Sequence, residues 1–456
     1  MATPANSGGP STDKPAGSHH AAVSRRLLAA VLLIVALSGC VRLVDLDRFS
    51  ATVFDEHYYV HDALLILHGD LGASPTDEWK PAKLLSVAHP DLGKLAIAAG
   101  IALFGNDAWG WRVPSALAGT ALIGLVFPLA RRMGLTAEWS LAALILAASD
   151  PMLMLESRLG VLDTFVALFT ALAVFCALGY VQAERRGVWL LACGVALGAA
   201  VASKWSGVLA VLAVAAVVVP ALVGRRQLRA SLGALVAALV LVPVAVYALS
   251  ATHYFAAGYD FADWFRLQAH MAGFGWGVQG DRSFASAPIT WPFDAVPIWY
   301  VWSLTQNGTV GLLAIGNPLL WWSASVAWVV LGVVALLRRD ARLGLAPLIV
   351  ATLYLPWLLT SRQTYIYYML PVVPFLAILL ASALAHFCGA QWISWHGGPD
   401  AILPERSELR PPWRRAAAWV FCLGCAAVGA LFVPFVLGLP VPFEYYDRLM
   451  VFTTWR

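Results

Sequence analysis

Apolar runs of about 20 residues recur from one end of this chain to the other, and they constrain its fold more than any other feature. A helix of that length crosses the hydrocarbon core of a membrane. Only 12% of the 456 residues are charged, against about a quarter in soluble domains. The sequence therefore predicts an all-α polytopic membrane protein. Its net charge of +4 gives no indication of nucleic-acid binding.

Hydropathy predicts about eleven membrane spans. They lie at residues 27–46, 112–130, 137–152, 160–182, 188–203, 206–223, 230–250, 318–337, 343–360, 365–387 and 415–438. Two further helices, at 57–68 and 91–104, are too short or too polar to cross and are expected to lie along the membrane surface.

Basic residues form clusters at every second turn between these spans. The clusters are Arg25-Arg26, Arg131-Arg132, Arg185-Arg186, Arg225-Arg226 with Arg229, Arg338-Arg339 with Arg342, and Arg410 with Arg414-Arg415. Because positive loops stay on the cytoplasmic side, the pattern places the N-terminus in the cytoplasm and the C-terminus outside.

The N-terminal 24 residues are rich in Ser, Pro, Gly and Ala and are predicted to form a disordered cytoplasmic tail. The apolar run after it is an uncleaved first span in our interpretation, although a secretory signal or a lipoprotein site at Cys40 is the alternative. Residues 25–456 are expected to form a single membrane domain. Its outer side carries two large segments, a first outer loop at 47–111 and a second, aromatic one at 251–317 that is expected to lie on the bilayer.

The first outer loop contains two adjacent carboxylates, Asp55 and Glu56, a few residues beyond the first span. Isolated ionisable residues also occur at the outer ends of spans, where burial is costly and function is the usual reason. They are Lys94, Arg112, Arg158, Asp163, Lys204 and Arg362. Alternatively, these cations reach the lipid headgroups and the acid pair is a surface loop. Converging on one face, the cations suit the phosphate of a lipid-linked sugar, and a carboxylate suits the activation of an acceptor hydroxyl.

Seven short motifs in order then resemble those of the protein O-mannosyltransferase family, whose members have the GT-C glycosyltransferase fold. The motifs are Phe54-Asp55-Glu56; His89-Pro90-Asp91-Leu92-Gly93-Lys94, with Asp91 replacing the usual second proline; Gly110-Trp111-Arg112; Glu156-Ser157-Arg158 with Leu162-Asp163; Ser203-Lys204-Trp205-Ser206-Gly207; Gly316-Asn317-Pro318 with Trp321-Trp322; and Arg362 with Tyr365, Tyr367-Tyr368 and Pro371.

One carboxylate suffices for an inverting displacement, and the catalytic candidates are Asp55, our choice as the base, and Glu56, which would orient its neighbours or the acceptor backbone. The resemblance implies transfer of mannose from polyprenyl-phosphate-mannose to Ser or Thr hydroxyls outside the membrane, with Asp55 as base and Arg112 on the phosphate. Donor-binding candidates are His89, Lys94, Arg112, Arg158, Asp163, Lys204, Arg362, Tyr365 and Tyr368. Segment 251–317 is too short for the β-trefoil (MIR) domain of eukaryotic members. The chain therefore looks like a bacterial plasma-membrane enzyme that modifies exported Ser/Thr-rich polypeptides, with the export machinery as a candidate partner.

Alternative functions remain open from the sequence. Another GT-C transferase would use a different polyprenyl-linked sugar or a lipid or glycan acceptor. A transporter would be expected to show repeated halves, and none is visible. No cofactor is expected, although a divalent metal could be held by Asp45 and Asp47, or by His57 and His61, which are one helical turn apart.

Overall fold

A computed structural model describes residues 24–71, 84, 88–183, 186–277, 284–390 and 411–456. The tail predicted at 1–24 lies outside this part of the chain except for Ser24, whose hydroxyl accepts a hydrogen bond from the amide of Leu27 and caps the first helix.

Helices form the body of the protein, as predicted. Within the described residues, nine helical stretches are long and apolar enough to cross a membrane. They are α1 (Arg25–Leu43), α4 (Ala108–Arg132), α7 (Asp163–Gln182), α8 (Arg186–Ser203), α9 (Leu209–Gly224) with a 3-10 turn before it, α10 (Leu228–Val236) continuing into α11 (Val242–Ser250), α14 (Pro318–Arg338), α15 (Ala341–Tyr354) with a 3-10 turn after it, and α17 (Pro412–Leu437).

Two of the eleven predicted spans are shorter helices. Span 137–152 is divided into α5 (Ala137–Ala148) and α6 (Pro151–Glu156), because Pro151 cannot continue a helix and Asp150 caps the second one by accepting from the Leu153 amide. Span 365–387 begins as a 3-10 turn and becomes helical only in α16 (Val373–Phe387). Both short helices pack inside the bundle, α5 on α4 and α16 on α5 and α14.

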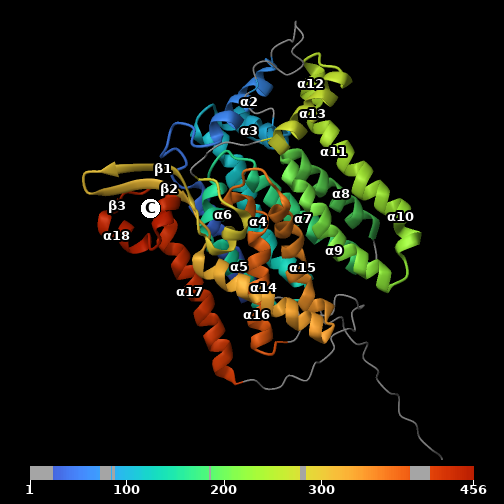
Figure 1. The fold of residues 1–456 in the computed structure, drawn as a ribbon, viewed down its shortest axis with the longest axis vertical. Coiled ribbons are helices and arrows are strands. Elements are labelled where there is room, and N and C mark those ends of the chain that lie inside the picture. Colours follow the sequence, from blue (N-terminus) through green and yellow to red (C-terminus); the bar gives the residue numbers. More distant parts are fainter. Residues whose placement is uncertain (1–23, 72–83, 85–87, 184–185, 278–283, 391–410) are drawn as a thin grey trace, which may run out of the picture.

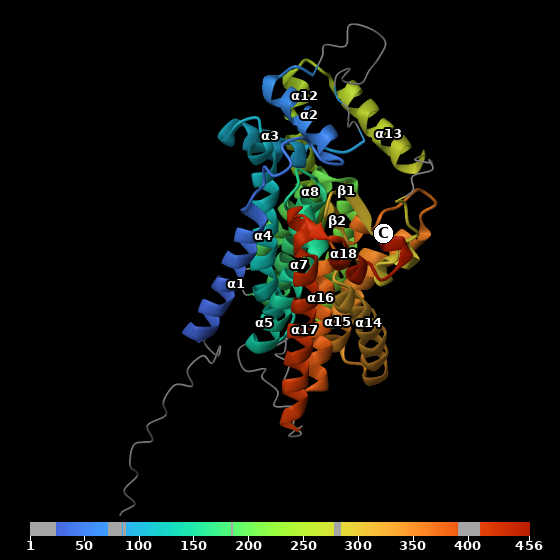
Figure 2. The ribbon, with the colours of Figure 1, turned by 90° about the vertical axis from the view of Figure 1, so that its left-hand side faces the viewer.

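The two short helices predicted in the first outer loop are present as α2 (Glu56–His68) and α3 (Leu92–Phe104), which pack on each other. With α12 (Thr252–Ala256) and α13 (Phe261–Gly277) they lie across one end of the long helices, at the top of Figures 1 and 2. This group is called the end cap below.

A small antiparallel sheet was not predicted. Strands β1 (Ile298–Thr305) and β2 (Gly308–Ala314) form a hairpin, and β3 (Val441–Pro442) adds beside β2. The hairpin projects sideways from the bundle in Figure 1, and the short helix α18 (Phe443–Leu449) follows β3. The local signal was present in the sequence, since aromatic and β-branched residues flank Asn307-Gly308, a pair typical of turns. Residues 298–314 of the second large segment thus form a regular hairpin, and the expectation that this segment lies on the bilayer stays a prediction.

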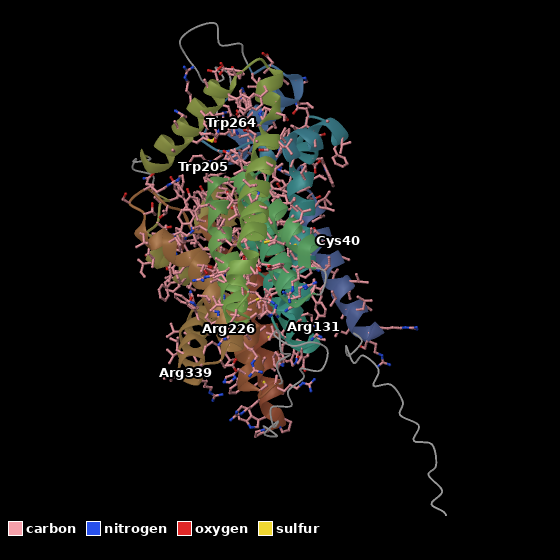
Figure 3. The ribbon with its side chains drawn as sticks, turned by 90° about the vertical axis from the view of Figure 1, so that its right-hand side faces the viewer. Cys40, Arg131, Trp205, Arg226, Trp264 and Arg339 are labelled. Carbon is pink, nitrogen blue, oxygen red and sulfur yellow. The ribbon has the colours of Figure 1, made fainter. Side chains whose placement is uncertain are left out.

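The charge pattern along the chain becomes a separation in space. Figure 3 shows Arg131, Arg226 and Arg339 toward one end of the molecule, and Trp205 and Trp264 toward the other. These three arginines, one from each of three basic clusters, thus lie toward the end opposite the end cap, as the alternation of charge predicts.

Candidate active site

The acidic pair lies where the first outer loop enters α2, inside the end cap. Phe54 has a positive φ of 54°, which is unusual for a bulky residue. Its ring stacks on Tyr300 of β1 with 4.1 Å between centroids and meets Tyr367 edge-on at 5.9 Å. Asp55 is the N-cap residue of α2, yet its carboxylate makes no capping hydrogen bond to that helix. The packing of Phe54 therefore fixes the turn from which Asp55 projects.

Glu56 is fully buried and serves the loop itself. Its carboxylate accepts hydrogen bonds from the amides of Val53 at 2.8 Å and Gly160 at 2.7 Å. Arg112 adds two more, from Nε at 2.8 Å and Nη2 at 2.7 Å. Four donors on one buried carboxylate bind the loop to α4 and to the turn after α6.

Arg112 also forms its hydrogen bonds with other residues of the chain. Besides Glu56, its Nη1 and Nη2 donate to backbone carbonyls of the first outer loop, those of Leu46, Phe49 and Ala51. Every nitrogen of this guanidinium therefore has a protein acceptor. This geometry favours a role in positioning the loop over the expected role as a phosphate ligand.

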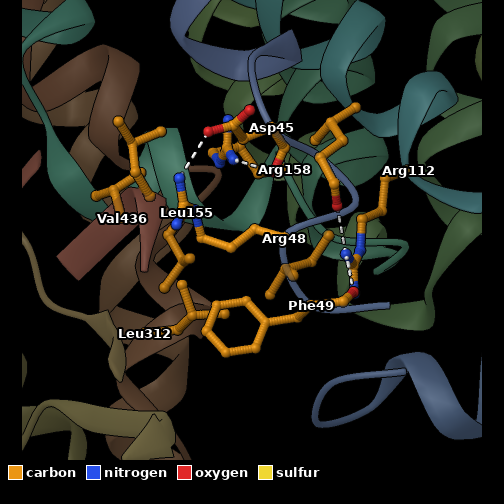
Figure 4. A pocket seen from close by; sticks show the side chains of 11 residues that line it. Asp45, Arg48, Phe49, Arg112, Leu155, Arg158, Leu312 and Val436 are labelled. Atoms are coloured by element: carbon orange, nitrogen blue, oxygen red, sulfur yellow. Dashed lines mark hydrogen bonds and ion pairs between the residues drawn. The ribbon is translucent and has the colours of Figure 1, made fainter. Parts of the chain in front are cut away.

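Arg158 also lies behind the loop. It donates to the carbonyls of Val41, Val44 and Asp45, where α1 ends, and so satisfies the terminal carbonyls of that helix. Figure 4 shows Arg158 and Arg112 lining a narrow pocket below the loop, between the end of α1, α6 and α17. The guanidinium of Arg112 thus has no N–H left for a donor phosphate, and three N–H groups of Arg158 are taken by backbone carbonyls.

Lys94 is enclosed between α2, α3 and α12. Its Nζ lies 2.8 Å from Oδ1 of Asp91 and 3.1 Å from Oδ2 of Asp62, and all three side chains are buried. On the other side of Asp91, Nε2 of His253 lies 3.2 Å from Oδ2. The cation expected on the donor thus stabilises the end cap, where two carboxylates neutralise it.

A second set of predicted residues does come together, around Lys204 and Tyr368. Nζ of Lys204 donates to both carboxylate oxygens of Asp163, at 3.0 and 2.8 Å. The ammonium also lies 5.1 Å from the ring centre of Tyr368. Nη2 of Arg362 donates to the Tyr368 hydroxyl at 3.0 Å, and the Tyr365 ring meets that of Tyr368 edge-on.

Electrostatics in this cluster follow from burial and from the mixture of charges. Burial alone would lower the pKa of Lys204, but Asp163 and the more distant Asp55 raise it, so the ammonium stays charged. Burial, with Lys204, Lys94 and Arg362 nearby, holds the pKa of His89 well below its usual range. His89 is therefore a neutral hydrogen-bonding group near these three cations.

Three further residues beside Asp55 were not among the predicted site residues: Glu156, Tyr300 and Tyr367. The Tyr300 hydroxyl donates to the Glu156 carboxyl. Burial, together with Asp163 and Asp55, raises the pKa of Glu156 to about 8. Glu156 belongs to a motif that the sequence analysis quoted, whereas Tyr300 could be found only by recognising the strand that carries it.

An apolar pocket continues from this cluster between α7, α9 and α15. Asp163 and Tyr368 line its polar part, and the rest of its lining is mainly apolar. The other lining residues are Thr170, Ser206, Leu209, Ala210, Leu353, Trp357, Pro371 and Val372. The pocket therefore joins a charged group to a surface suited to a hydrocarbon chain.

Two of the residues considered for a metal have partners within the protein. Asp45 forms an ion pair with Arg48 at 2.7 Å, and His61 lies 3.5 Å from Asp62. In the part of the chain that the structure describes, no group of three or more His, Cys, Asp or Glu residues comes together as metal ligands.

Two family models match this sequence. The model described as dolichyl-phosphate-mannose-protein mannosyltransferase matches residues 88–249, and the model of the C-terminal four-transmembrane region of protein-O-mannosyltransferase matches residues 260–455. Together they cover more than three quarters of the 456 residues.

Curated relatives match over nearly the whole chain. A polyprenol-phosphate-mannose–protein mannosyltransferase of Mycolicibacterium smegmatis is 27% identical, covering 94% of this chain and 93% of the relative. One from Corynebacterium glutamicum is 25% identical, covering 94% and 92%.

Solved structures share the fold. The Saccharomyces cerevisiae protein O-mannosyltransferase Pmt1-Pmt2 complex bound to the sugar donor matches with a TM-score of 0.78 at 14% identity, covering 95% of this chain and 93% of that one. ArnT from Cupriavidus metallidurans bound to undecaprenyl phosphate matches with a TM-score of 0.56 at 19% identity, covering 90% and 75%. These likenesses confirm the GT-C fold.

Proposed function

Because this chain belongs to the protein O-mannosyltransferase family, we propose that it transfers mannose from a polyprenol-phosphate-mannose donor to a Ser or Thr hydroxyl of a polypeptide. The observation that carries the proposal is the Lys204–Asp163 pair, which lies within electrostatic reach of Asp55 and contacts Tyr368, where Arg362 and the apolar pocket also meet. A carboxylate can activate an acceptor hydroxyl, and two cations can bind a phosphate. An apolar pocket suits a prenyl chain.

The donor would enter from the bilayer with its prenyl chain in the apolar pocket. Its phosphate would then lie near Lys204 and Arg362, whose tyrosine contacts leave them beside the cavity. Neutral His89 can add a hydrogen bond without adding charge. Tyr365 and Tyr368 supply ring faces for the sugar or the first prenyl units.

The reaction is an inverting displacement in this scheme. Asp55 accepts the proton of the acceptor hydroxyl while that oxygen bonds to the anomeric carbon, and the bond from the anomeric carbon to the phosphate oxygen breaks on the opposite face. The electron pair leaves on the phosphate, where Lys204 and Arg362 stabilise the new charge. Glu56 and Arg112 act through the position of the loop, and no metal takes part.

We further propose that the transfer takes place on the outer face of a bacterial plasma membrane. The positions of Arg131, Arg226 and Arg339, toward the end of the molecule away from Trp205, support this orientation. Acceptors would then be exported polypeptides, which reach that face unfolded. The export machinery is a candidate partner for this reason.

The test is mannose transfer by the purified protein from labelled polyprenyl-phosphate-mannose to a Ser/Thr-containing peptide. Asp55→Asn is expected to lower kcat by about 10²–10⁴-fold, whereas Asp70→Asn, an exposed carboxylate just beyond the other end of α2, should match the wild type. EDTA should leave the rate unchanged. Retained activity in Asp55→Asn would refute the base assignment, and reaction only with another lipid-linked sugar would refute the donor assignment.

A further inference from the structure

Strand β1 has one paired edge and one open edge. The strand order is β1-β2-β3, so β2 is paired on both sides. Within the described residues, no backbone hydrogen bond reaches the outer edge of β1. Alternate residues of an antiparallel strand turn their N–H and C=O groups to the edge away from the partner, so this edge presents unused donors and acceptors.

This edge also lacks the usual protection. Natural edge strands carry charges, prolines or short lengths that prevent further pairing. β1 is eight residues long, Ile298–Thr305, and contains neither a charged residue nor a proline. Its outer half is exposed, with Trp302 at 46% and Leu304 at 63% of their full accessible surface. A strand of this kind is a template for pairing with another extended chain.

The inner end of the same strand lies in the candidate active site. The register of the hairpin shifts between Trp299 and Val301, which leaves Tyr300 as an extra residue in a bulge. Bulges change the direction of a side chain, and the Tyr300 hydroxyl here reaches Glu156 while its ring stacks on Phe54. Phe54 directly precedes Asp55, so the open edge leads away from the proposed base.

We propose that the acceptor polypeptide binds as an added strand along the open edge of β1, with its Ser or Thr at Asp55. This inference rests on the proposed function. At about 3.4 Å per residue, a peptide paired as far as Leu304 extends about 13 Å from Tyr300. Backbone pairing is largely independent of side chains, so such a site accepts many sequences provided that the acceptor is extended.

The acceptor is favoured over a second copy of this chain as the occupant because the edge is continuous with the site. A partner strand from another copy would cover the approach that an acceptor needs, from Leu304 inwards to Tyr300. Figure 1 shows the hairpin standing clear of the helices, so an extended chain can lie beside β1 along its outer half.

The first experiment uses acceptor peptides with one Ser and about four residues on each side, in which single backbone amides are N-methylated. A methyl group on an amide that pairs with β1 removes one hydrogen bond, so we expect KM to rise about five- to tenfold, with kcat unchanged. The effect should appear at every second residue, on one side of the Ser only. Methylation without this alternation, or with equal effects on both sides, would overturn the inference.

The unmodified peptide separates this inference from the proposed function. If it accepts no mannose, the proposed function fails. If it accepts mannose while all methylated peptides react equally well, only the added-strand inference fails.

The second experiment places a photocrosslinking amino acid at Leu304 on β1 or at Phe443, an exposed apolar residue just after β3 at the opposite edge of the sheet. We expect the acceptor peptide to be captured from position 304 and not from 443, with competition by unlabelled peptide. Equal capture from both positions, or capture of a second copy of the chain from 304, would contradict the proposal.

Discussion

Two adjacent carboxylates, Asp55 and Glu56, have different surroundings because adjacent residues at a helix start point in different directions. Glu56 turns inward and receives four hydrogen bonds, while Asp55 remains partly exposed beside Tyr300 and Lys204. The sequence predicts Asp55 as the base and Glu56 as a residue that orients its neighbours. The hydrogen bonds of Glu56 to Arg112 and to the amides of Val53 and Gly160 are consistent with an orienting role.

Removing the charge of Glu56 should lower the stability of the protein, and any loss of transfer activity should follow from that. In Glu56→Gln, buried Arg112 loses its ionic partner, and breaking a buried pair in this way typically costs about 3–5 kcal/mol. We expect a clearly lower Tm in detergent for this variant and little change in Tm for Asp55→Asn. A Glu56→Gln protein with wild-type Tm and no transfer activity would instead place Glu56 in the chemistry.

The protonation of Glu156 predicts a pH dependence of stability. Its pKa is about 8 in the folded protein against an ordinary value of 4.5, so between these values the folded state holds a proton that the unfolded state releases. The free energy of unfolding therefore falls as pH rises through this window, by up to about 1.4 kcal/mol per unit.

Glu156→Gln removes this titration and keeps an acceptor for the Tyr300 hydroxyl. We expect the Tm of the variant to exceed that of the wild type by an amount that grows from pH 5 to pH 8. A Tm difference that is constant across this range would show that Glu156 is ionised in the folded protein.

At the scale of elements, a buried ionic network connects α2, α3 and α12. Asp91 stands where the family motif has a second proline, at the start of α3, and it is held between Lys94 and His253. Burial opposes ionisation of Asp91, but Lys94 and His253 outweigh it and hold its pKa well below the usual value. Asp91, which replaces that proline, thus takes part in ionic contacts with Lys94 and His253.

Lys94 should matter for the end cap rather than for donor affinity. Lys94→Met leaves Asp62 and Asp91 buried without their cation, and we expect about 3–5 kcal/mol of destabilisation. Arg266→Met is the matched control, because Arg266 forms an exposed pair with Asp263 on α13 that should contribute at most about 1 kcal/mol. Limited proteolysis and Tm would report the loss. A Lys94→Met protein with unchanged stability and a raised KM for the donor would instead support the prediction that Lys94 contacts the donor phosphate.

At the scale of the whole molecule, basic clusters and aromatic loops occupy opposite ends. The topology prediction can be tested by introducing cysteines at two exposed positions, Gln306 in the hairpin turn and Arg339 after α14. A membrane-impermeant thiol reagent should label Gln306→Cys in intact cells and label Arg339→Cys only after lysis. The wild type, with its six native cysteines, gives the background. Labelling of Arg339→Cys in intact cells would reverse the orientation.

The membrane helices were the most predictable part of the fold. Apolar length alone located α1, α4, α7 and α8 to within a few residues, and it separated α2 and α3 from the spans. It failed where proline and a capping aspartate divide α5 from α6, because hydropathy averages over such local breaks. It also gave no indication of β1 and β2, because a hydropathy average does not distinguish a strand from an irregular segment.

The sequence by itself determined the class of fold, the family motifs and the set of outer ionisable residues, because each depends on residue type and spacing along the chain. Only the tertiary structure decided which of these ionisable residues gather at the candidate site and which contact other parts of the protein. Lys204 and Arg362 gather with Asp163 around Tyr368, whereas Arg112, Arg158 and Lys94 contact carbonyls and carboxylates of other parts of the protein. A buried cation takes whatever acceptors the packing brings within hydrogen-bonding distance, and that proximity arises between residues far apart in sequence.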